Sequence, residues 1–415
     1  MMTIGMSDEF TSFDQRAVIK VCGIGGGGGN AVNRMIADGM RDVEFIVINT
    51  DAQALKNSTA PTRIQIGMEI TGGLGSGAKP EIGQKAALED RERLAEVLRG
   101  ADMVFLTAGL GGGTGTGASP VIAETASSTG ALVVGIVTLP FAFEGRERIQ
   151  NAIEGLDALE GHVDSLIVVP NDRVAELGQH STSLLSAFHQ ADGVLHNGVR
   201  AITELITVHG LINVDFADVR TVMQKRGRAL MGIGLAEGEY RAVRAAEEAI
   251  VCPLLEQSDI EGATGVIVNV KGGCDIGMRE VQEAVMTVKK GAHASANIIF
   301  GAVIDEEERT DLQVTVIAAG FPAEAALRKA PEAPALEVAE PEPTQTAAET
   351  GATPDEAAEA AEAAPGLQTE FDVGEPDNAD ADSEVDFNKP AYQRREKAEE
   401  DLGIPAFMRK RKRKQ

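Results

Sequence analysis

The first half of the chain alternates short, almost continuous apolar runs with segments of helical spacing. Such runs are typical of parallel strands that are buried on both faces of a sheet. The expected strands are 17–22, 43–49, 103–108, 131–137 and 165–169, and the expected helices are 30–38, 85–98, 119–128 and 146–159. Because strands and helices alternate, the pattern predicts a doubly wound parallel sheet up to about residue 180.

A long helix and a second α/β unit follow this region. Apolar residues recur at three- and four-residue steps from Ser183 to about His209, which predicts a helix about 40 Å long, enough to join two domains. Beyond it, strands are expected at 229–235, 265–270, 297–304 and 312–318, and helices at 241–251 and 278–289. These elements indicate a smaller α/β domain.

After Phe321 the composition changes to Ala, Glu, Pro, Thr and Asp, and no apolar period remains. Residues 331–388 carry 17 acidic side chains and neither Lys nor Arg, so we expect a disordered linker. A short apolar motif, DLGIPAFM at 401–408, interrupts this polarity and is followed by the basic run RKRKRK at 409–414.

Charge and composition narrow the classes of partner. The net charge of −26 repels nucleic acid and anionic membrane surfaces, and only the terminal basic run departs from it. The chain has no tryptophan and two tyrosines, which argues against stacking on single-stranded nucleic acid. Three cysteines without a pairing pattern, and no signal peptide or spanning segment, predict a soluble cytoplasmic protein. The six histidines show no metal spacing, so no transition metal is expected.

The first glycine-rich segment, residues 23–30, lies between an expected strand and an expected helix. Glycines there allow a phosphate to approach the backbone, and a helix N-terminus supplies free N–H groups. The spacing of Gly23, Gly25 and Gly28 also fits GxGxxG, and Asp51 follows the next strand. By itself this segment favours a dinucleotide site, while a tight turn without a ligand is the alternative.

The second glycine-rich segment, residues 111–117, reads GGGTGTG and again lies between a strand and a helix. A dinucleotide has one pyrophosphate and does not need two such loops, whereas a triphosphate could use both. The chain has no GxxxxGK[ST] motif, and no lysine is placed to neutralise the phosphates. We therefore expect Mg²⁺ to accompany the nucleotide.

The chain resembles the tubulin-like cell-division GTPases of bacteria, the FtsZ family, over residues 17–320. The motifs that carry the resemblance are IGGGGGNAV, NTDAQAL, GLGSGAKPEIG, GLGGGTGTGASPV, PFAFEG and NVDFADV. It implies a tubulin-like fold and a GTPase that binds GTP and GDP and polymerises head to tail into the cytokinetic ring at mid-cell, on the inner face of the membrane. The implied regions are a disordered N-terminus (1–16), a GTP-binding domain (17–182), a central helix (183–210), a C-terminal α/β domain (211–320), a linker (321–400) and a tail (401–415).

The same resemblance implies roles for single residues. The phosphates would be held by Gly25, Gly26, Gly27, Gly28, Gly29, Asn30, Gly75, Gly77, Gly111, Gly112, Gly113, Thr114, Gly115, Thr116 and Gly117. The ribose and base would contact Glu144, Arg148, Asn171, Phe188 and Asp192.

The residues expected at the ribose and base also have simpler interpretations. Glu144 and Arg148 have the spacing of an ordinary ion pair on a helix, and Phe188 alone could be a core residue. An aromatic ring can stack on a purine, however. A carboxylate at Asp192 could accept hydrogen bonds from guanine N1–H and the 2-amino group, which adenine lacks.

The candidate catalytic residues are Asn213, Asp215 and Asp218, in the segment after the long helix. The resemblance implies that they complete the site of the next subunit and orient the water that attacks the γ-phosphate. From the sequence alone, the capping of a helix is the favoured explanation of Asp215.

The tail motif at 401–408 is similar to the family's docking peptide for membrane-tethering and regulatory division proteins, although Gly403 stands where an acidic residue is common. The basic run at 409–414 could contact an anionic membrane or neighbouring filaments, or could be a solvated end. Two other functions remain open at this point. They are a nicotinamide-dependent oxidoreductase, from GxGxxG and Asp51, and a scaffold that binds nucleotide without hydrolysing it.

Overall fold

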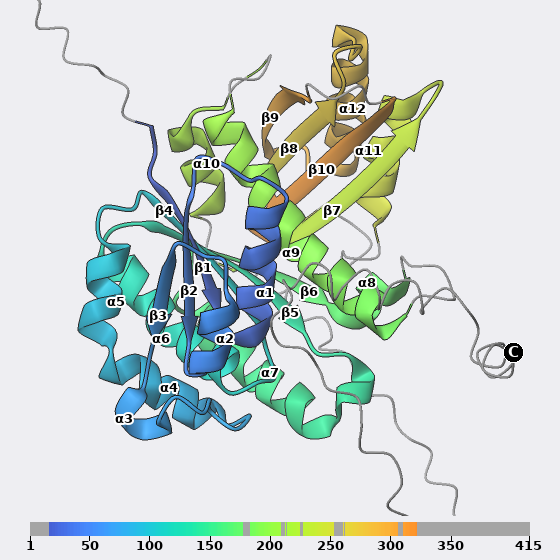
Figure 1. The fold of residues 1–415 in the computed structure, drawn as a ribbon. Helices are drawn as coiled ribbons and strands as arrows, with labels where there is room; N and C mark the ends of the chain where they lie inside the picture. Colours follow the sequence, from blue (N-terminus) through green and yellow to red (C-terminus); the bar gives the residue numbers. More distant parts are fainter. Residues whose placement is uncertain are drawn as a thin grey trace, which may run out of the picture. The chain divides into compact units, whose positions relative to one another are not determined.

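The computed structural model describes residues 16–176, 183–208, 212, 214–224, 227–252, 260, 262–305 and 310–321 (Figure 1). The chain divides into two compact segments, and all of these residues lie within the first, Met1–Ala335. The predictions made for residues 1–15 and 322–415, including the linker and the tail motif, fall outside the described residues. Among the described helices, none combines the length and the apolarity that a membrane crossing requires.

The predicted doubly wound sheet is confirmed. Six strands lie side by side in the order β3-β2-β1-β4-β5-β6, and all of their pairings are parallel. Their bounds are β1 Ile19–Ile24, β2 Glu44–Asn49, β3 Thr62–Gln65, β4 Met103–Gly109, β5 Leu132–Leu139 and β6 Ser165–Pro170. The sequence pattern did not predict β3, a four-residue edge strand in which only Ile64 is buried.

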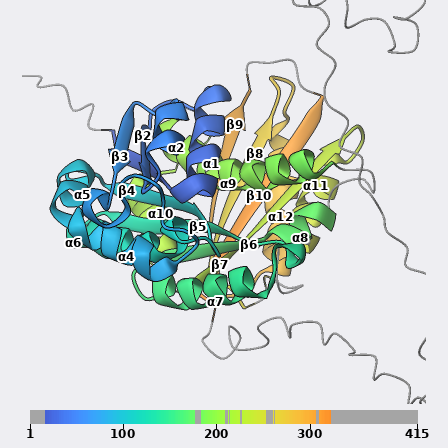
Figure 2. The same cartoon turned by 60° about the horizontal axis from the view of Figure 1, so that its bottom comes forward.

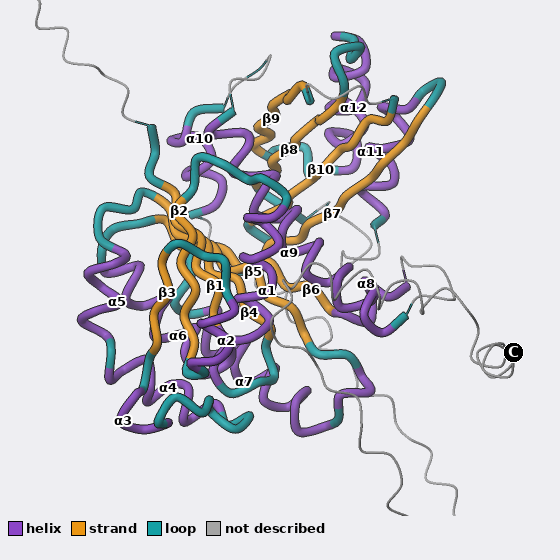
Figure 3. Tube along the Cα trace, in the orientation of Figure 1, coloured by secondary structure: helices purple, strands orange, loops and turns teal. Residues whose placement is uncertain are grey.

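The smaller α/β unit contributes β7 Arg228–Glu237, β8 Gly265–Gly272, β9 Asn297–Ile304 and β10 Asp311–Ala319. Their order is β7-β10-β8-β9, and β10 runs antiparallel to both of its neighbours. The first residues of β7 also pair with β6, at Leu166 and Ile167, so the ten strands form one hydrogen-bonded series (Figure 3). The pairing at this junction is short, while β7 and β10 pair along almost their whole length.

The helices differ from the predictions mainly at their N-termini. The α1 helix starts inside the first glycine run and α6 starts at Thr114, earlier than the predicted starts at 30 and 119. The predicted helix 85–98 is two helices, separated at Asp90, whose carboxylate accepts a hydrogen bond from Gly67 N at 2.8 Å. The helices are α1 Gly25–Ala37, α2 Ala52–Asn57, α3 Met68–Thr71, α4 Pro80–Glu89, α5 Arg91–Leu98, α6 Thr114–Ser128, α7 Arg146–Glu160, α8 Asn171–Glu176, α9 Leu184–Thr207, α10 Phe216–Met223, α11 Arg241–Val251 and α12 Met278–Gly291, and a 3-10 turn spans Ala142–Glu144.

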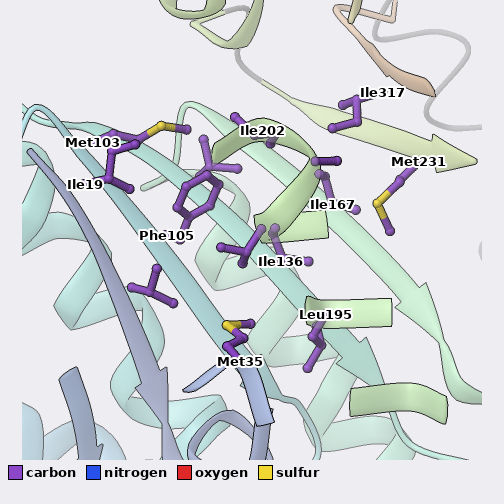
Figure 4. Packing of buried hydrophobic residues seen from close by; sticks show 14 of the residues in the cluster. Ile19, Met35, Met103, Phe105, Ile136, Ile167, Leu195, Ile202, Met231 and Ile317 are labelled. Atoms are coloured by element: carbon purple, nitrogen blue, oxygen red, sulfur yellow. The ribbon is translucent and has the colours of Figure 1, made fainter. Parts of the chain in front are cut away.

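The long helix α9 joins the unit built on the first sheet to the smaller α/β unit. Figure 2 shows it between the helices of the first sheet and the strands of the second. Leu195 and Ile202 of α9 belong to one buried cluster with residues of β1, β4 and β5 and with Met231 and Ile317 of the second unit (Figure 4). Because a single core extends through both units, α9 has a fixed place between them.

A buried histidine on α9 connects it to α1. The side chain of His196 is 5% exposed, its Nδ1 lies 3.2 Å from Oδ2 of Asp38, and its Nε2 has no partner among the described residues. Burial lowers the pKa of His196 from 6.5 to about 4, although the charge of Asp38 acts in the opposite direction. The folded protein therefore holds this ring neutral at neutral pH.

We predict that His196 makes the fold sensitive to acid. Between pH 6.5 and about 4 the unfolded chain takes up a proton that the folded chain does not, so the free energy of unfolding falls as the pH falls. His196→Gln removes this contribution and should lose about 2 kcal/mol less stability across that window than the parent. Urea unfolding of both proteins at several pH values measures the difference, and equal losses would contradict the assignment.

Candidate functional site

A cavity of about 430 Å³ opens at the carboxyl ends of the strands of the first sheet, where β1 and β4 begin connections that lead in opposite directions. This reversal of strand order is where ligands bind in doubly wound sheets. The cavity is lined by Gly26, Gly27, Asn30, Ser76, Gly109, Leu110, Gly112, Gly113, Thr114, Gly115, Thr138, Pro140, Glu144, Arg148, Asn171, Phe188, Ala191 and Asp192. Residues from both glycine-rich segments and from α9 are thus brought together at one site.

Two of the lining glycines, Gly26 and Gly112, have no role in the packing of the chain itself. A Cβ atom added to either would meet no protein atom within 4 Å, and neither residue has a positive φ. Glycine in a helix costs about 0.5–1 kcal/mol relative to alanine, and Gly26 lies in the first turn of α1. Glycine at these two positions leaves room for a ligand to approach the backbone.

Other predicted glycines are required by the fold instead. A Cβ on Gly28 would lie 2.2 Å from the carbonyl oxygen of Thr107, and one on Gly117 would lie 1.9 Å from that of Pro80. The residues Gly25 and Gly111 have φ angles of 71° and 95°, which side chains rarely adopt. These glycines allow α1 and α6 to start close beside β4 and α4, so they shape the cavity without lining it.

Several predicted phosphate contacts therefore lie outside the cavity lining. They are Gly25, Gly28, Gly29, Gly75, Gly77, Gly111, Thr116 and Gly117. The hydroxyl group of Thr116 accepts a hydrogen bond from Gly111 N at 2.8 Å, so it holds the second glycine loop together. Within the 72–79 loop Ser76 lines the cavity, whereas Gly75 and Gly77, which the family resemblance implied as phosphate contacts, do not.

Three hydroxyl groups, those of Thr50, Ser76 and Thr114, meet beside the second glycine-rich segment, and only Thr114 was among the predicted residues. Thr114 Oγ1 lies 2.7 Å from Thr50 Oγ1 and 3.0 Å from Ser76 Oγ. Thr50 directly follows β2, Ser76 belongs to the loop before α4, and Thr114 is the first residue of α6. Three separate segments of the chain therefore meet here. No single motif in the sequence contains all three residues.

The cavity lining also includes the residues expected at a ribose and a base. Glu144 and Arg148 form an ion pair, which agrees with the simpler interpretation of their spacing, and both also line the cavity. Phe188 is 40% exposed, and its ring lies 5.2 Å from that of Phe141 in an edge-on arrangement. The ring of Phe188 is therefore not a fully buried core residue, and stacking on a base is open to it.

Two further polar side chains, those of Asn171 and Asp192, line the cavity together with Phe188. The Oδ1 atom of Asn171 is buried without a hydrogen bond among the described residues. Burial raises the pKa of Asp192 to about 6, while the charges of Arg34 and His189 lower it. At neutral pH the carboxylate of Asp192 is therefore ionised and can accept hydrogen bonds from a ligand. A buried acceptor and a carboxylate on one cavity wall fit a base with several N–H groups.

The side chain of Asp51 does not support the dinucleotide interpretation. It accepts hydrogen bonds from Gln53 N at 2.8 Å and Ala54 N at 3.2 Å and so caps α2. It is also absent from the cavity lining. A Rossmann site would need this carboxylate for a ribose hydroxyl group.

The predicted catalytic residues lie elsewhere. Asn213 falls outside the described residues. Asp215 occupies the N-cap position of α10, but its side chain accepts no capping hydrogen bond, and both Asp215 and Asp218 are exposed. Asp215 is therefore at the predicted cap position, but its carboxylate does not make the capping hydrogen bond. Figure 1 shows α10 at the upper end of the first sheet and α3, α4 and α7 at its lower end.

The cavity is poor in cationic groups for a phosphate site. Among the described residues that line it, Arg148 is the only cation, and this side chain is paired with Glu144. Among the described residues, no group of three His, Cys, Asp or Glu side chains is placed to hold a metal ion. The glycine-rich segments, Ser76 and Thr114 offer backbone N–H and hydroxyl groups as donors, and such groups fit phosphate oxygens.

Comparison with known proteins agrees with this geometry. Residues 18–179 match the GTPase domain of the Tubulin/FtsZ family, and residues 227–322 match the C-terminal domain of the FtsZ family. The chain belongs to the FtsZ family. An empty FtsZ dimer from M. jannaschii is 45% identical in sequence and similar in structure with a TM-score of 0.71, over 73% of this chain and 88% of that one.

Two further structures extend the comparison. A mutant FtsZ from M. jannaschii matches with the same identity of 45% and the same TM-score of 0.71, over 74% of this chain and 92% of that one. CetZ2 from Haloferax volcanii, described as a GTPγS-bound protofilament, has 23% identity and a TM-score of 0.63, over 74% and 94% of the two chains. The CetZ2 likeness shows the fold alone. Membership of the FtsZ family supports a polymerising GTPase of the cytoskeleton that binds GTP and GDP and acts in cell division.

We predict that two neighbouring glycines of α1 respond to alanine in opposite ways. Gly26→Ala should leave stability unchanged or raise it by about 0.5–1 kcal/mol, because the added methyl group enters open space and alanine favours the helix. The same change should weaken GTP binding about tenfold or more by occupying the cavity. Gly28→Ala should instead lower the melting temperature because its Cβ collides with the backbone at Thr107. If Gly26→Ala bound GTP as the parent does, the cavity would not be the phosphate site.

Proposed function

We propose that this chain is a cell-division GTPase that assembles head to tail and hydrolyses GTP at the junction of two subunits. The observation that carries the proposal is the separation of two sets of residues by α9. The cavity includes Phe188 and Asp192 near the N-terminus of this helix, whereas Asp215 and Asp218 follow its C-terminus. With 24 residues, α9 is about 36 Å long.

A rigid helix of this length keeps the acidic residues away from the cavity of their own chain. Both residues are nevertheless exposed, and the side chain of Asp215 makes no capping hydrogen bond. A second copy that stacks in the same orientation would bring its own Asp215 and Asp218 toward the cavity of the first. One subunit would then supply the nucleotide pocket and the next would supply the acidic groups.

The surroundings of the cavity suit contact with another subunit. Large apolar side chains within three positions of lining residues along the chain are strongly exposed: Leu74 by 88%, Phe143 by 66% and Leu185 by 69%. Exposed apolar side chains suit contact with a protein partner. Because the two contacting faces would be different, the arrangement is heterologous and need not close, so it extends into a filament.

Each set of residues has a simple chemical task in this arrangement. The glycine N–H groups and the hydroxyl groups of Ser76 and Thr114 would donate to phosphate oxygens, and Asp192 would accept from the N1–H and 2-amino groups of guanine. Asn213, Asp215 and Asp218 of the neighbour would orient and polarise the attacking water. Mg²⁺, held mainly by the phosphates and by water, would supply the positive charge that the cavity lining lacks.

The wider cellular role rests on the family and on residues 322–415. We propose that the filaments form the cytokinetic ring in the cytoplasm at mid-cell. Residues 401–408 would dock onto membrane-tethering and regulatory division proteins, and the basic run 409–414 would contact an anionic membrane. Liposome sedimentation with and without residues 409–415 tests the last of these contacts.

The shared site can be tested by mixing two inactive variants. Asp218→Ala keeps its cavity and should bind GTP and polymerise but turn over far more slowly, whereas Asp192→Ala keeps the acidic pair but has an impaired cavity. In an equal mixture, about a quarter of random junctions would combine an intact cavity with an intact Asp218, so phosphate release should return to that fraction of the parent rate.

A matched control separates this rescue from simple dilution effects. Either single variant mixed with the double variant Asp192→Ala/Asp218→Ala should show little more activity than it shows alone, because one intact element is then missing from every junction. If the two single variants together released phosphate no faster than the sum of their separate rates, hydrolysis would not occur at a shared site.

Guanine selection should depend on pH. Since the pKa of Asp192 is about 6 without ligand, its carboxylate becomes protonated below that pH and can no longer accept two hydrogen bonds. The affinity for GDP should therefore fall about tenfold between pH 7 and pH 5, as expected for a titrating group. The Asp192→Asn variant should bind weakly at both pH values. A pH-independent affinity of the parent would rule out this role.

A further inference from the structure

The three hydroxyl groups that meet beside the second glycine-rich segment are not equivalent. Ser76 and Thr114 line the cavity, whereas Thr50 does not and is 0% exposed. The contacts are Thr50 Oγ1 to Thr114 Oγ1 at 2.7 Å and Thr114 Oγ1 to Ser76 Oγ at 3.0 Å. Ser76 fits closely against the second glycine loop, since a Cβ on Gly113 would lie 2.2 Å from its oxygen.

The number of hydroxyl protons determines which of the three groups donates to which. Each hydroxyl group has one proton to donate, and two hydrogen bonds join the three oxygens, so one proton is left over. If Thr114 donated to Thr50, the proton of Thr50 would be buried without an acceptor. In the described part of the chain, the Thr50 hydroxyl group hydrogen-bonds to Thr114 alone. An unpaired buried donor is unfavourable. Thr50 therefore donates to Thr114.

The leftover proton then belongs to a group that lines the cavity. If Thr114 donates to Ser76, the proton of Ser76 is free, and if Ser76 donates to Thr114, the proton of Thr114 is free. In both arrangements the series of hydroxyl groups ends with an O–H bond available to the cavity. Such an end suits an acceptor such as a phosphate oxygen, and successive hydrogen bonds strengthen one another.

We propose that Thr50, although outside the cavity, is a positioning residue for nucleotide phosphate, because its buried hydroxyl group holds the Thr114 and Ser76 hydroxyl groups as donors toward the ligand. The inference rests on the proposed nucleotide function. It assigns to the end of β2 a role in phosphate binding that acts through Thr114. It also accounts for a polar side chain in a completely buried position beside the glycine loops.

The primary test compares Thr50→Val with Thr50→Ser in the full-length chain. Valine keeps the shape of threonine and removes the hydroxyl group, and serine keeps the hydroxyl group. We expect Thr50→Val to bind GTP and GDP about fivefold more weakly, as for one weakened hydrogen bond, and Thr50→Ser to bind them like the parent. Thr125→Val is the matched control, since Thr125 is a buried threonine further along α6 and bonds only within that helix at Val121 O.

A second measurement separates positioning from a general effect on the fold. Guanosine has no phosphate, so its competition against labelled nucleotide should be unchanged by Thr50→Val, and the melting temperature without nucleotide should stay close to that of the parent. In a Thr114→Val background, Thr50→Val should cause no further loss of affinity because the group through which it acts is gone. Such non-additivity is the sign of a coupled pair.

The outcomes distinguish this inference from the proposed function. If the parent chain does not bind GTP, the proposed function fails. If the parent binds GTP but Thr50→Val binds it equally well, the positioning role is wrong and the proposed function stands. Equal losses for guanosine and GTP, or a full additional loss in the Thr114→Val background, would also overturn the role of Thr50.

Discussion

The length of α9 is the constraint on which the account of this molecule depends. From Val194 to Leu205 the helix is packed into the core that the first sheet and the smaller α/β unit share. Its N-terminal part contributes Phe188 and Asp192 to the cavity, and Asp215 and Asp218 come after its C-terminal end. From Asp192 to the last residue of the helix, Thr207, the rise is about 22 Å, and this separation cannot be closed within one chain without breaking that core. The same helix that organises the monomer therefore leaves its proposed catalytic groups for another subunit.

The glycines of the two loops serve different physical purposes. At Gly28 and Gly117 the missing side chain lets backbone segments touch, and at Gly25 and Gly111 it permits a positive φ. At Gly26 and Gly112 neither reason applies, and the space beside the backbone opens into the cavity. A sequence motif cannot distinguish these cases because each letter is the same. The distinction matters functionally, since only the last group leaves room for a ligand.

Much of the fold could be predicted because it depends on local periodicity. The strands at 103–108 and 297–304 and the long helix appear close to their predicted positions, since apolar runs and three- to four-residue steps are strong local signals. The starts of α1 and α6 could not be predicted, because glycine-rich turns become helical only when they pack against β4 and α4. The short edge strand β3 has one buried residue and gives no period.

The site was predictable only where a motif marked it. Phe188, Asp192 and part of each glycine-rich segment line the cavity, whereas Ser76 and Thr138 were not among the predicted residues, and Thr50 contacts Thr114 without lining the cavity. These hydroxyl residues are common types in unremarkable contexts, and only the parallel sheet brings them together. The acidic pair was found through the family resemblance, because two exposed carboxylates near a helix start have no distinctive sequence signal.

The most direct test of the shared site is the rate of phosphate release per subunit, measured as the full-length protein is diluted at saturating GTP. Sites completed by a neighbour predict a rate that falls steeply toward zero below the concentration at which filaments form, while bound GTP remains on the monomers. A constant rate per subunit down to isolated monomers would show that one chain contains the whole catalytic site, and it would contradict the account.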